Sequence, residues 1–244
     1  MAIKELWRLA NVCSLSFVFV ACGSNESLES QTKVRNAELS FHNNIPVFYS
    51  QDGRCTASYI SQEPPVVLTA RHCVERSWQE NQGKVPEGHR AYFVFRDQVE
   101  AETINAVEYF YPEKKFLEFG PFMIPNDYAL LRLASAPNAN MRPFTLAEET
   151  PKFGQPMRVV GYGQSDCKGI IKGKDNAAIQ RELNYKWGIN FNVCPGDSGG
   201  PHFKENNEVI AVSSAVGLFG ESHMKIAKHR DAIYAQISKW SESL

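Results

Sequence analysis

The stretch NVCPGDSGGPHF, residues 192–203, places Ser198 among glycines, directly after an acidic residue and four residues beyond a cysteine. A serine hydroxyl is a weak nucleophile at neutral pH unless a base lies within hydrogen-bond reach. A turn rich in glycine and aspartate can also be no more than a connection between two strands. The fold and the role of Ser198 therefore depend on what the rest of the chain supplies.

The composition is that of an ordinary globular protein. The chain has 244 residues, 43% hydrophobic and 22% charged, with a formal net charge of −1. This length suits one large domain or two small ones. No basic stripe or acidic run stands out, so we do not expect nucleic acid as a partner.

The N-terminus has the pattern of an export signal. Lys4 and Arg8 precede an uncharged, mostly apolar run, Leu9–Ala21. This run is too short to cross a bilayer as a helix, which needs about 20 residues. Basic residues before it and small residues after it indicate a secretory signal over residues 1–21. A buried N-terminal helix is the weaker alternative, because nothing polar alternates with the run.

The segment FVACGSNES, residues 19–27, resembles the lipobox of bacterial lipoproteins, although Phe19 stands where that family usually has leucine. The resemblance implies a lipid on Cys22, which becomes the mature N-terminus; plain secretion is the alternative. The cysteine count agrees. Six cysteines, less Cys13 in the signal, leave an odd number in an exported protein, and lipidation of Cys22 restores an even set.

Beyond this point the chain alternates short apolar runs with turn residues. Residues 22–33 are polar and lack periodicity, which indicates a tether or a propeptide. The runs that follow are rich in Val, Ile, Tyr and Phe: IPVFY (45–49), VVLTA (66–70), AYFVF (91–95), YALLRL (128–133), MRVVGYG (157–163) and VIAVSSAV (209–216). Many short strands with few helical stretches predict an all-β sandwich or barrel.

Two further features concern the organisation of the chain. SAPNANMRP, residues 135–143, is the best candidate for a boundary between two halves of similar size. The clearest helix closes the chain, since Ile233, Ile237, Trp240 and Leu244 lie at i, i+4, i+7 and i+11 on one helical face.

Three segments carry residues suited to nucleophilic catalysis. His72 lies in VVLTARHCV (66–74), Asp127 in NDYALLRL (126–133) and Ser198 in CPGDSGGP (194–201). Alone, each has an ordinary explanation: a structural histidine, a turn acid and a turn serine. Together, and in the order His, Asp, Ser, they resemble the trypsin/chymotrypsin-like serine peptidases, whose patterns are TAAHC, D-x-A-L-L-x-L and GDSGGP.

The resemblance covers residues 34–244 and implies a fold and a mechanism. The fold is all-β, with two six-stranded antiparallel Greek-key barrels, residues 34–138 and 139–244, and a C-terminal α-helix. His72 is the base for Ser198, and Asp127 orients its ring. The N–H groups of Gly196 and Ser198 form the oxyanion hole. Ser214 aligns with the family serine that supports the catalytic aspartate, and a plain strand serine is the alternative.

The family resemblance also implies how the cysteines pair. Cys55 and Cys73 match the bridge beside the catalytic histidine. Cys194 usually pairs with a later cysteine in the family, but none follows it here, so we predict a Cys167–Cys194 bridge. A Cys/Cys/His zinc site is the competing interpretation; it is disfavoured because no CxxC or HExxH pair is present. We expect no metal and no cofactor.

In this family a new N-terminus, freed by cleavage before a hydrophobic residue, pairs with the acid that precedes the nucleophile. Here that acid is Asp197, and the position matching the IVGG start is Val34-Arg35-Asn36-Ala37, preceded by Lys33. We therefore expect cleavage at Lys33–Val34 by an activating protease, with a constitutively active enzyme as the alternative.

Substrate preference is predicted from three positions of the family pocket. Asn192 stands at the pocket base where trypsin-like enzymes have aspartate, so Lys and Arg lose their usual charge partner. On the far wall, Ser214-Ala215-Val216 replaces Ser-Trp-Gly, and Val216 should narrow the pocket. We expect a preference for a small or medium uncharged side chain.

The sequence thus predicts a monomeric serine endopeptidase acting on protein or peptide substrates. It would be secreted, or held in the bacterial cell envelope through a lipid on Cys22 as its only membrane attachment. A catalytically silent binding module of the same fold is the main alternative, although such members usually lack a triad residue. An esterase is disfavoured because its nucleophile elbow is absent and the histidine comes first.

Overall fold

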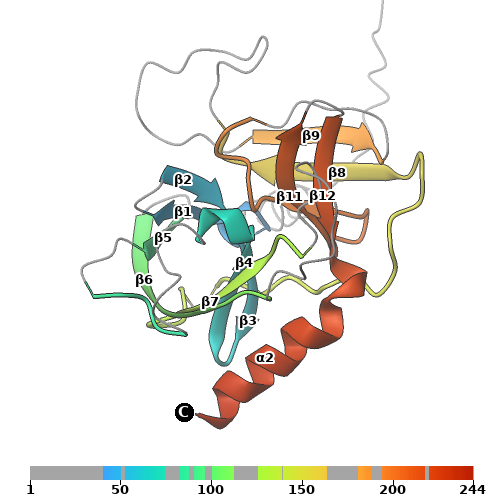
Figure 1. Ribbon diagram of the computed structural model, residues 1–244. Helices are drawn as coiled ribbons and strands as arrows, with labels where there is room; N and C mark the ends of the chain where they lie inside the picture. Colours follow the sequence, from blue (N-terminus) through green and yellow to red (C-terminus); the bar gives the residue numbers. More distant parts are fainter. Residues whose placement is uncertain are drawn as a thin grey trace, which may run out of the picture. The chain divides into compact units, whose positions relative to one another are not determined.

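The computed structural model describes residues 41–50, 53–74, 83–87, 91–96, 101–112, 126–138, 140–163, 181–187, 194–217 and 220–243. All of these belong to one compact unit, Asn36–Leu244. The described residues form two antiparallel β-sheets and a C-terminal helix (Figure 1).

The first sheet curls round on itself. Its strands are β1 (Val47–Ser50), β2 (Gly53–Thr56), β3 (Ser58–Gln62), β4 (Pro65–Thr69), β5 (Ala91–Arg96), β6 (Ala101–Phe110) and β7 (Ala129–Leu133). They follow the order β2-β1-β5-β6-β7-β4-β3. Only Ala57 separates β2 from β3, so the two ends of this order are halves of one bent strand. The sheet therefore closes into a barrel of six continuous strands, as predicted.

The second sheet follows in sequence. Its described strands are β8 (Pro156–Gly161), β9 (Arg181–Lys186), β10 (Pro201–Phe203), β11 (Val209–Gly217) and β12 (Gly220–Lys225), in the order β12-β11-β10-β8-β9. Every strand pair in both sheets is antiparallel. The SAPNANMRP segment lies between the two sheets in sequence, and the domain boundary at residue 138 remains a prediction.

The apolar run of β4 is explained by burial on both of its faces. Val67 packs inside the first barrel, whereas Val66 and Leu68 belong to a second core cluster that also contains residues of β8, β10, β11 and α2. Side chains alternate between the faces of a strand, so a strand buried on both sides must be apolar at consecutive positions. Each such side chain contributes about 1.5–3 kcal/mol when fully buried.

The C-terminal helix is confirmed. Helix α2 spans Arg230–Glu242, and three of its predicted core residues, Ile233, Ile237 and Trp240, are buried. They join the cluster that β4 shares with the second sheet. Leu244, the fourth residue of the predicted face, lies outside the described residues. Within the described ranges, no helix combines the length and the apolar character that crossing a bilayer requires.

Candidate active site

His72 is held by a short 3-10 helix, η1 (Arg71–Cys73), that begins two residues after β4 ends. The N–H of Cys73 donates to the carbonyl of Ala70 at 3.2 Å, which closes the turn. The predicted Cys55–Cys73 disulfide is confirmed, with an S–S distance of 2.06 Å, and it ties η1 to β2. Main-chain and covalent restraints therefore fix the backbone on which the imidazole stands.

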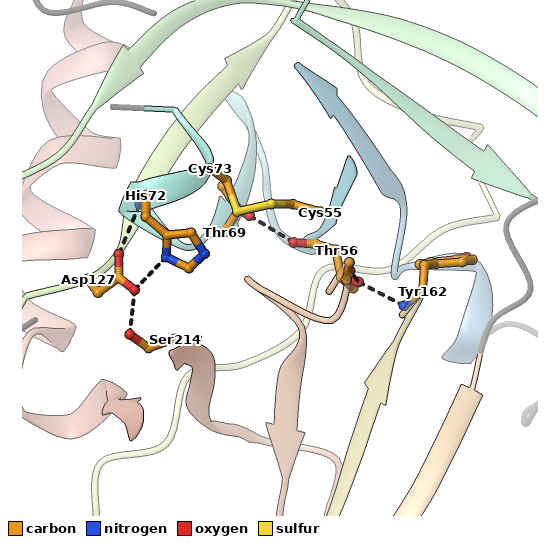
Figure 2. The surroundings of a disulfide bond; sticks show 9 residues. Cys55, Thr56, Thr69, His72, Cys73, Asp127, Tyr162 and Ser214 are labelled. Carbon is orange, nitrogen blue, oxygen red and sulfur yellow. Dashed lines mark hydrogen bonds and ion pairs between the residues drawn. A yellow bond between two sulfur atoms is a disulfide. The ribbon is translucent and has the colours of Figure 1, made fainter. Parts of the chain in front are cut away.

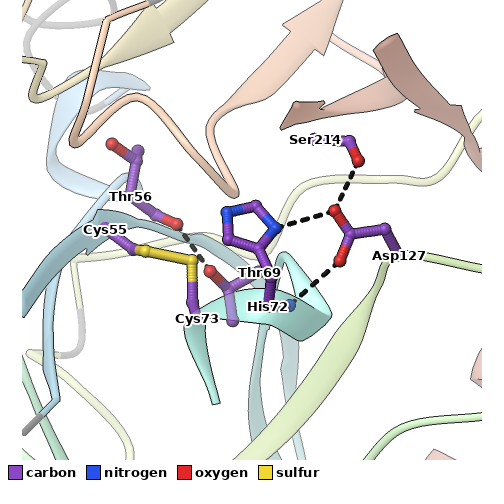
Figure 3. A network of polar contacts seen from close by, with 7 residues as sticks. All are labelled: Cys55, Thr56, Thr69, His72, Cys73, Asp127 and Ser214. Atoms are coloured by element: carbon purple, nitrogen blue, oxygen red, sulfur yellow. Dashed lines mark hydrogen bonds and ion pairs between the residues drawn. A yellow bond between two sulfur atoms is a disulfide. The ribbon is translucent and has the colours of Figure 1, made fainter. Parts of the chain in front are cut away.

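Asp127 holds the imidazole at two points. His72 Nδ1 lies 2.8 Å from Asp127 Oδ2, and the backbone N–H of His72 donates to Oδ1 at 3.0 Å. The hydroxyl of Ser214 on β11 donates to the same Oδ2 (Figure 3). With Nδ1 facing a carboxylate, the neutral ring carries its proton on Nδ1, and its lone pair lies on Nε2.

Asp127 is completely buried, yet it favours the charged form. Burial by itself raises the pKa of the Asp127 carboxyl. The hydrogen bonds and charge interaction with His72, together with the hydroxyl of Ser214, outweigh this effect, and the net pKa lies below its ordinary value. The carboxylate therefore stays ionised at neutral pH and stabilises an imidazolium beside it.

Ser198 shares a pocket with His72. The pocket has a volume of about 260 Å³ and is lined by Ser50, Gly53, Arg54, Cys55, His72, Cys73, Pro195, Gly196 and Ser198. Among the described residues, no hydrogen bond joins Ser198 Oγ to His72. Such bonds are often long in a free enzyme and tighten when substrate binds. The pocket thus brings the predicted nucleophile and base to one cavity.

Thr56 joins the first sheet to the loop that carries Ser198. Its Oγ1 donates to the carbonyl of Gly196 at 2.8 Å and accepts from the N–H of Tyr162 at 2.9 Å. Its N–H donates to the carbonyl of Ser198 at 2.8 Å, and its own carbonyl accepts from Thr69 Oγ1 at 2.8 Å (Figure 2). Thr56 thus makes four hydrogen bonds through three groups, and two of these bonds hold the loop that carries Ser198.

The glycines of the loop are required by close packing. Gly199 has a φ of +81°, and a Cβ there would overlap Thr69 Oγ1 and the carbonyl oxygen of Thr56. A Cβ on Gly200 would come within 2.5 Å of the carbonyl oxygen of Val160. The loop lies so close to both sheets that only glycine fits at these positions.

The predicted oxyanion donors lie at the same pocket. Gly196 has a φ of +103°, a conformation that L side chains rarely adopt. Within the described part of the chain, neither the N–H of Gly196 nor that of Ser198 donates a hydrogen bond to another residue. Their role as oxyanion donors remains a prediction.

Asp197, the predicted partner of a new N-terminus, points away from solvent and is 5% exposed. Its Oδ1 accepts from the N–H of Gly163 at 2.6 Å, and its Oδ2 accepts from the N–H of Cys194 at 2.9 Å. The carboxylate thus links the Ser198 loop to the end of β8.

Several predicted residues cannot be placed. Lys33, Val34, Cys22, Cys167 and Asn192 lie outside the described residues, so lipidation, activation, the Cys167–Cys194 pairing and the pocket base remain predictions. Val216 is placed on β11 by its backbone alone.

Thr56 and Thr69 were not predicted as site residues. Thr69 belongs to the TARHC motif, and Thr56 directly follows Cys55, but a threonine in a β-strand gives no sign of its distant partners. A polar cluster in the second sheet, with His202 and Ser213 buried and His223 partly buried, was also not predicted. His202 Nε2 lies 2.9 Å from Ser213 Oγ, and the ring centroids of His202 and His223 are 4.4 Å apart.

Two antiparallel β-sheets with a histidine–carboxylate pair beside a serine in a glycine-rich turn define the class of chymotrypsin-like serine hydrolases. Comparison with known proteins supports the class. The family model described as Trypsin matches residues 33–240. A trypsin of Sarcophaga bullata is 29% identical over 185 residues, which are 66% of this chain and 67% of that protein.

Solved structures share the fold at low identity. Mouse neuropsin, a serine protease expressed in the limbic system of the brain, superposes with a TM-score of 0.58 at 16% identity, covering 81% of this chain and 96% of that one. Human heparin binding protein superposes with a TM-score of 0.57 at 18% identity, covering 80% of this chain and 92% of that one. The scabies mite inactivated protease paralogue S-D1 superposes with a TM-score of 0.61 at 15% identity, covering 82% of this chain and 94% of that one. The chain belongs to the trypsin family of serine endopeptidases.

Proposed function

We propose that the chain hydrolyses peptide bonds through an acyl-enzyme, with Ser198 as nucleophile, His72 as general base and Asp127 as the residue that orients the base. The observation that carries this proposal is the His72–Asp127 pair, 2.8 Å apart, at the pocket that Ser198 lines. Catalysis by a serine needs a neutral imidazole whose free nitrogen faces the hydroxyl, and the buried Asp127 carboxylate selects that tautomer.

The reaction follows from the geometry. Ser198 Oγ attacks the scissile carbonyl carbon while His72 Nε2 takes the hydroxyl proton. The negative charge that develops on the carbonyl oxygen is met by the N–H groups of Gly196 and Ser198, each worth about 3–4 kcal/mol in such sites. The imidazolium then gives its proton to the leaving amine. Water, deprotonated by the same nitrogen, hydrolyses the acyl-enzyme and restores Ser198.

A fluorophosphonate probe tests the nucleophile directly. The folded and processed protein should be labelled at Ser198, Ser198→Ala should not be labelled, and Asp127→Asn should react far more slowly because its imidazole is held in the wrong tautomer. Ser135→Ala is the matched control, because Ser135 is exposed. Absence of label on properly folded wild-type protein would overturn the proposal.

The second candidate is a catalytically silent binding module. Among the structures of the same fold are a heparin binding protein and an inactivated protease paralogue, so the fold by itself does not guarantee turnover. The complete His72, Asp127 and Ser198 set favours the enzyme. Stable ligand binding without probe labelling would favour the module.

Activation by cleavage at Lys33–Val34 is supported by Asp197. A buried carboxylate that already links the nucleophile loop to β8 could receive a new ammonium group and thereby order the oxyanion donors. Wild-type protein should gain activity as Val34 becomes the N-terminus, as measured by N-terminal sequencing. Lys33→Gln should stay uncleaved and inactive; full activity of the intact Lys33→Gln chain would contradict the mechanism.

The specificity pocket is proposed from Asn192, Ser214 and Val216. Without an acid at its base and with valine on its wall, the pocket should accept a small or medium uncharged side chain. Cleavage-site profiling on a peptide library tests this, and preferential cleavage after Lys or Arg would refute it. Asn192→Asp is the informative variant, because it should shift cleavage towards basic residues.

Two proposals concern the exported form. Cys22 should carry a lipid, so Cys22→Ser should abolish incorporation of a labelled fatty acid while leaving Ser198 reactive. Equal incorporation in the wild type and the variant would indicate another attachment site.

Cys167 and Cys194 should form the second bridge, and a disulfide-linked peptide pair in a non-reducing digest would identify it. Recovery of both as alkylated thiols would disprove the bridge.

A further inference from the structure

The pocket beside Ser198 contains the donor set of a metal site. The sulfur atoms of Cys55 and Cys73 and one ligating atom of His72 all lie within 4.8 Å of one another. Two thiolates and one imidazole are ligands that Zn²⁺ prefers, and three protein ligands leave a fourth position open. In the described ranges this is the one group of three such residues.

In the oxidised protein the two sulfurs are bonded to each other and do not act as thiolate ligands. We propose that reduction of the Cys55–Cys73 bridge converts this corner of the pocket into a Zn²⁺ site, with Cys55, Cys73 and His72 as ligands. The metal would hold the reduced chain inactive, a consequence that rests on the proposed function because it assumes His72 to be the general base.

The imidazole is already oriented for such a ligand role. Asp127 holds Nδ1 at 2.8 Å, and this leaves the lone pair of Nε2 free to coordinate. In Figures 2 and 3 the second ring nitrogen of His72 lies on the side of the disulfide, away from Asp127. Carboxylate–histidine–metal arrangements of this kind fix the tautomer and strengthen the imidazole as a ligand.

The two cysteines should stay close after reduction. The Cα atoms of Cys55 and Cys73 are 6.4 Å apart. Zn–S bonds of 2.3 Å at a tetrahedral angle place two sulfurs about 3.8 Å apart, which side-chain rotation can reach. The hydrogen bond from Thr69 Oγ1 to the carbonyl of Thr56, 2.8 Å long, joins the end of β4 to the residue after Cys55 and does not depend on the bridge.

The chemistry balances with a phosphine as reductant. The phosphine, the disulfide and one water give the phosphine oxide and two thiols, Cys55 and Cys73. Zn²⁺ then binds both sulfurs and His72 Nε2, and the two thiol protons are released to solvent. All three ligands line the pocket that contains Ser198, so the ion can enter from solvent. His72 Nε2, once bound to the metal, can no longer accept the proton of Ser198.

Co²⁺, used as a spectroscopic substitute for Zn²⁺, tests the site without relying on catalysis. Full-length Ser198→Ala protein, reduced by the phosphine, should bind one Co²⁺ with a sulfur-to-cobalt charge-transfer absorption, and the oxidised protein should not. His72→Ala should weaken binding about 10-fold or more. Cys55→Ser/Cys73→Ser should lose the charge-transfer band, whereas Cys194→Ser should keep it. A band that persists in the double variant, or that is absent from the reduced protein, would overturn the proposal.

Inhibition is measured separately on the wild type. Reduced protein should lose more than nine-tenths of its activity with Zn²⁺ and regain it with a chelator, while oxidised protein should be unaffected by the same Zn²⁺ concentration. Equal inhibition of oxidised and reduced protein would refute the mechanism. If the protein binds Co²⁺ as expected but never reacts with a fluorophosphonate, the proposed peptidase function fails and the metal site stands.

Discussion

The hydroxyl of Thr56 donates a 2.8 Å hydrogen bond to the carbonyl oxygen of Gly196, a residue 140 positions away in the chain. This contact, made between the first barrel and the loop that carries Ser198, is buried. Thr56 Oγ1 also accepts from the N–H of Tyr162, so one hydroxyl satisfies two backbone groups. A threonine of the other sheet therefore holds the peptide that follows Gly196, directly next to the peptide that carries one predicted oxyanion donor, the N–H of Gly196.

Thr56→Val should lower both stability and activity. Valine matches the shape of threonine but leaves the Gly196 carbonyl and the Tyr162 N–H without this partner. Each unsatisfied buried group costs about 1–3 kcal/mol, so we expect the loss of two partners to lower the free energy of unfolding by about 2–6 kcal/mol. We expect kcat/KM to fall about 10-fold or more, because the Gly196 peptide is less firmly held. Thr56→Ser, which keeps the hydroxyl, should retain most of the stability and most of the activity. Equal losses of stability and activity in Thr56→Val and Thr56→Ser would contradict this account. Chemical denaturation and peptide hydrolysis provide the measurements.

Gly199 and Gly154 form a matched pair for testing close packing. Both have a positive φ, +81° and +77°, but a Cβ on Gly154 meets nothing within 4 Å, whereas one on Gly199 overlaps Thr69 and Thr56. Gly154→Ala should cost about 1–2 kcal/mol of unfolding free energy through backbone strain alone. Gly199→Ala should cost clearly more and abolish probe labelling. Similar thermal shifts for the two variants would show that the loop can move away.

Ser214→Ala should slow catalysis without unfolding the protein. The hydroxyl of Ser214 donates to the Asp127 oxygen that also faces His72 Nδ1, and it helps to lower the pKa of that carboxyl. Its removal should lower kcat with little change in KM, by about 10-fold for a charge-assisted hydrogen bond of 1.5 kcal/mol. Steady-state kinetics would reveal this split, with exposed Ser135→Ala as control. A rise in KM at constant kcat would instead assign Ser214 to substrate binding alone.

The buried His202 and the partly buried His223 of the second sheet should make the protein sensitive to acid. Burial lowers the pKa of His223 to about 4. Burial also lowers the pKa of His202 well below its ordinary value, and charge repulsion from His223 lowers it further. A depressed folded-state pKa means that the unfolded chain binds protons first, so stability is complete above about pH 6.5 and falls as the pH drops towards 4. The loss due to His223 should approach about 3 kcal/mol.

Urea denaturation between pH 7.5 and 4.5 tests this dependence. His202→Gln/His223→Gln removes both titrating groups, so its free energy of unfolding should fall less steeply than that of the wild type over this range. Since these substitutions also change packing, the slope with pH is the relevant quantity rather than the absolute stability. Identical slopes would show that other groups cause the acid sensitivity.

Local patterns in the amino-acid sequence predict the class of fold and the segments that carry the site. Apolar runs such as that of β4 predict strands, because strand propensity and hydrophobic periodicity can be recognised from a few consecutive residues. The helical face of Ile233, Ile237 and Trp240 was predicted for the same reason, and all three are buried. The Cys55–Cys73 bridge followed from family resemblance and is confirmed. The roles of His72, Asp127 and Ser198 stay predictions, although the structure brings His72 into contact with Asp127 and into one pocket with Ser198.

Long-range packing of the folded chain specifies which residues hold that site in place. Nothing near Thr56 in the sequence indicates Gly196 or Tyr162, and nothing near His202 indicates Ser213 or His223. His202, Ser213 and His223 meet because β10, β11 and β12 pair with a particular register, and a shift of one residue would exchange the side-chain faces. Thr56 meets Gly196 and Tyr162 through long-range hydrogen bonds from the first sheet. Local sequence specifies the strands, whereas register and packing, which depend on the whole chain, specify the contacts between them.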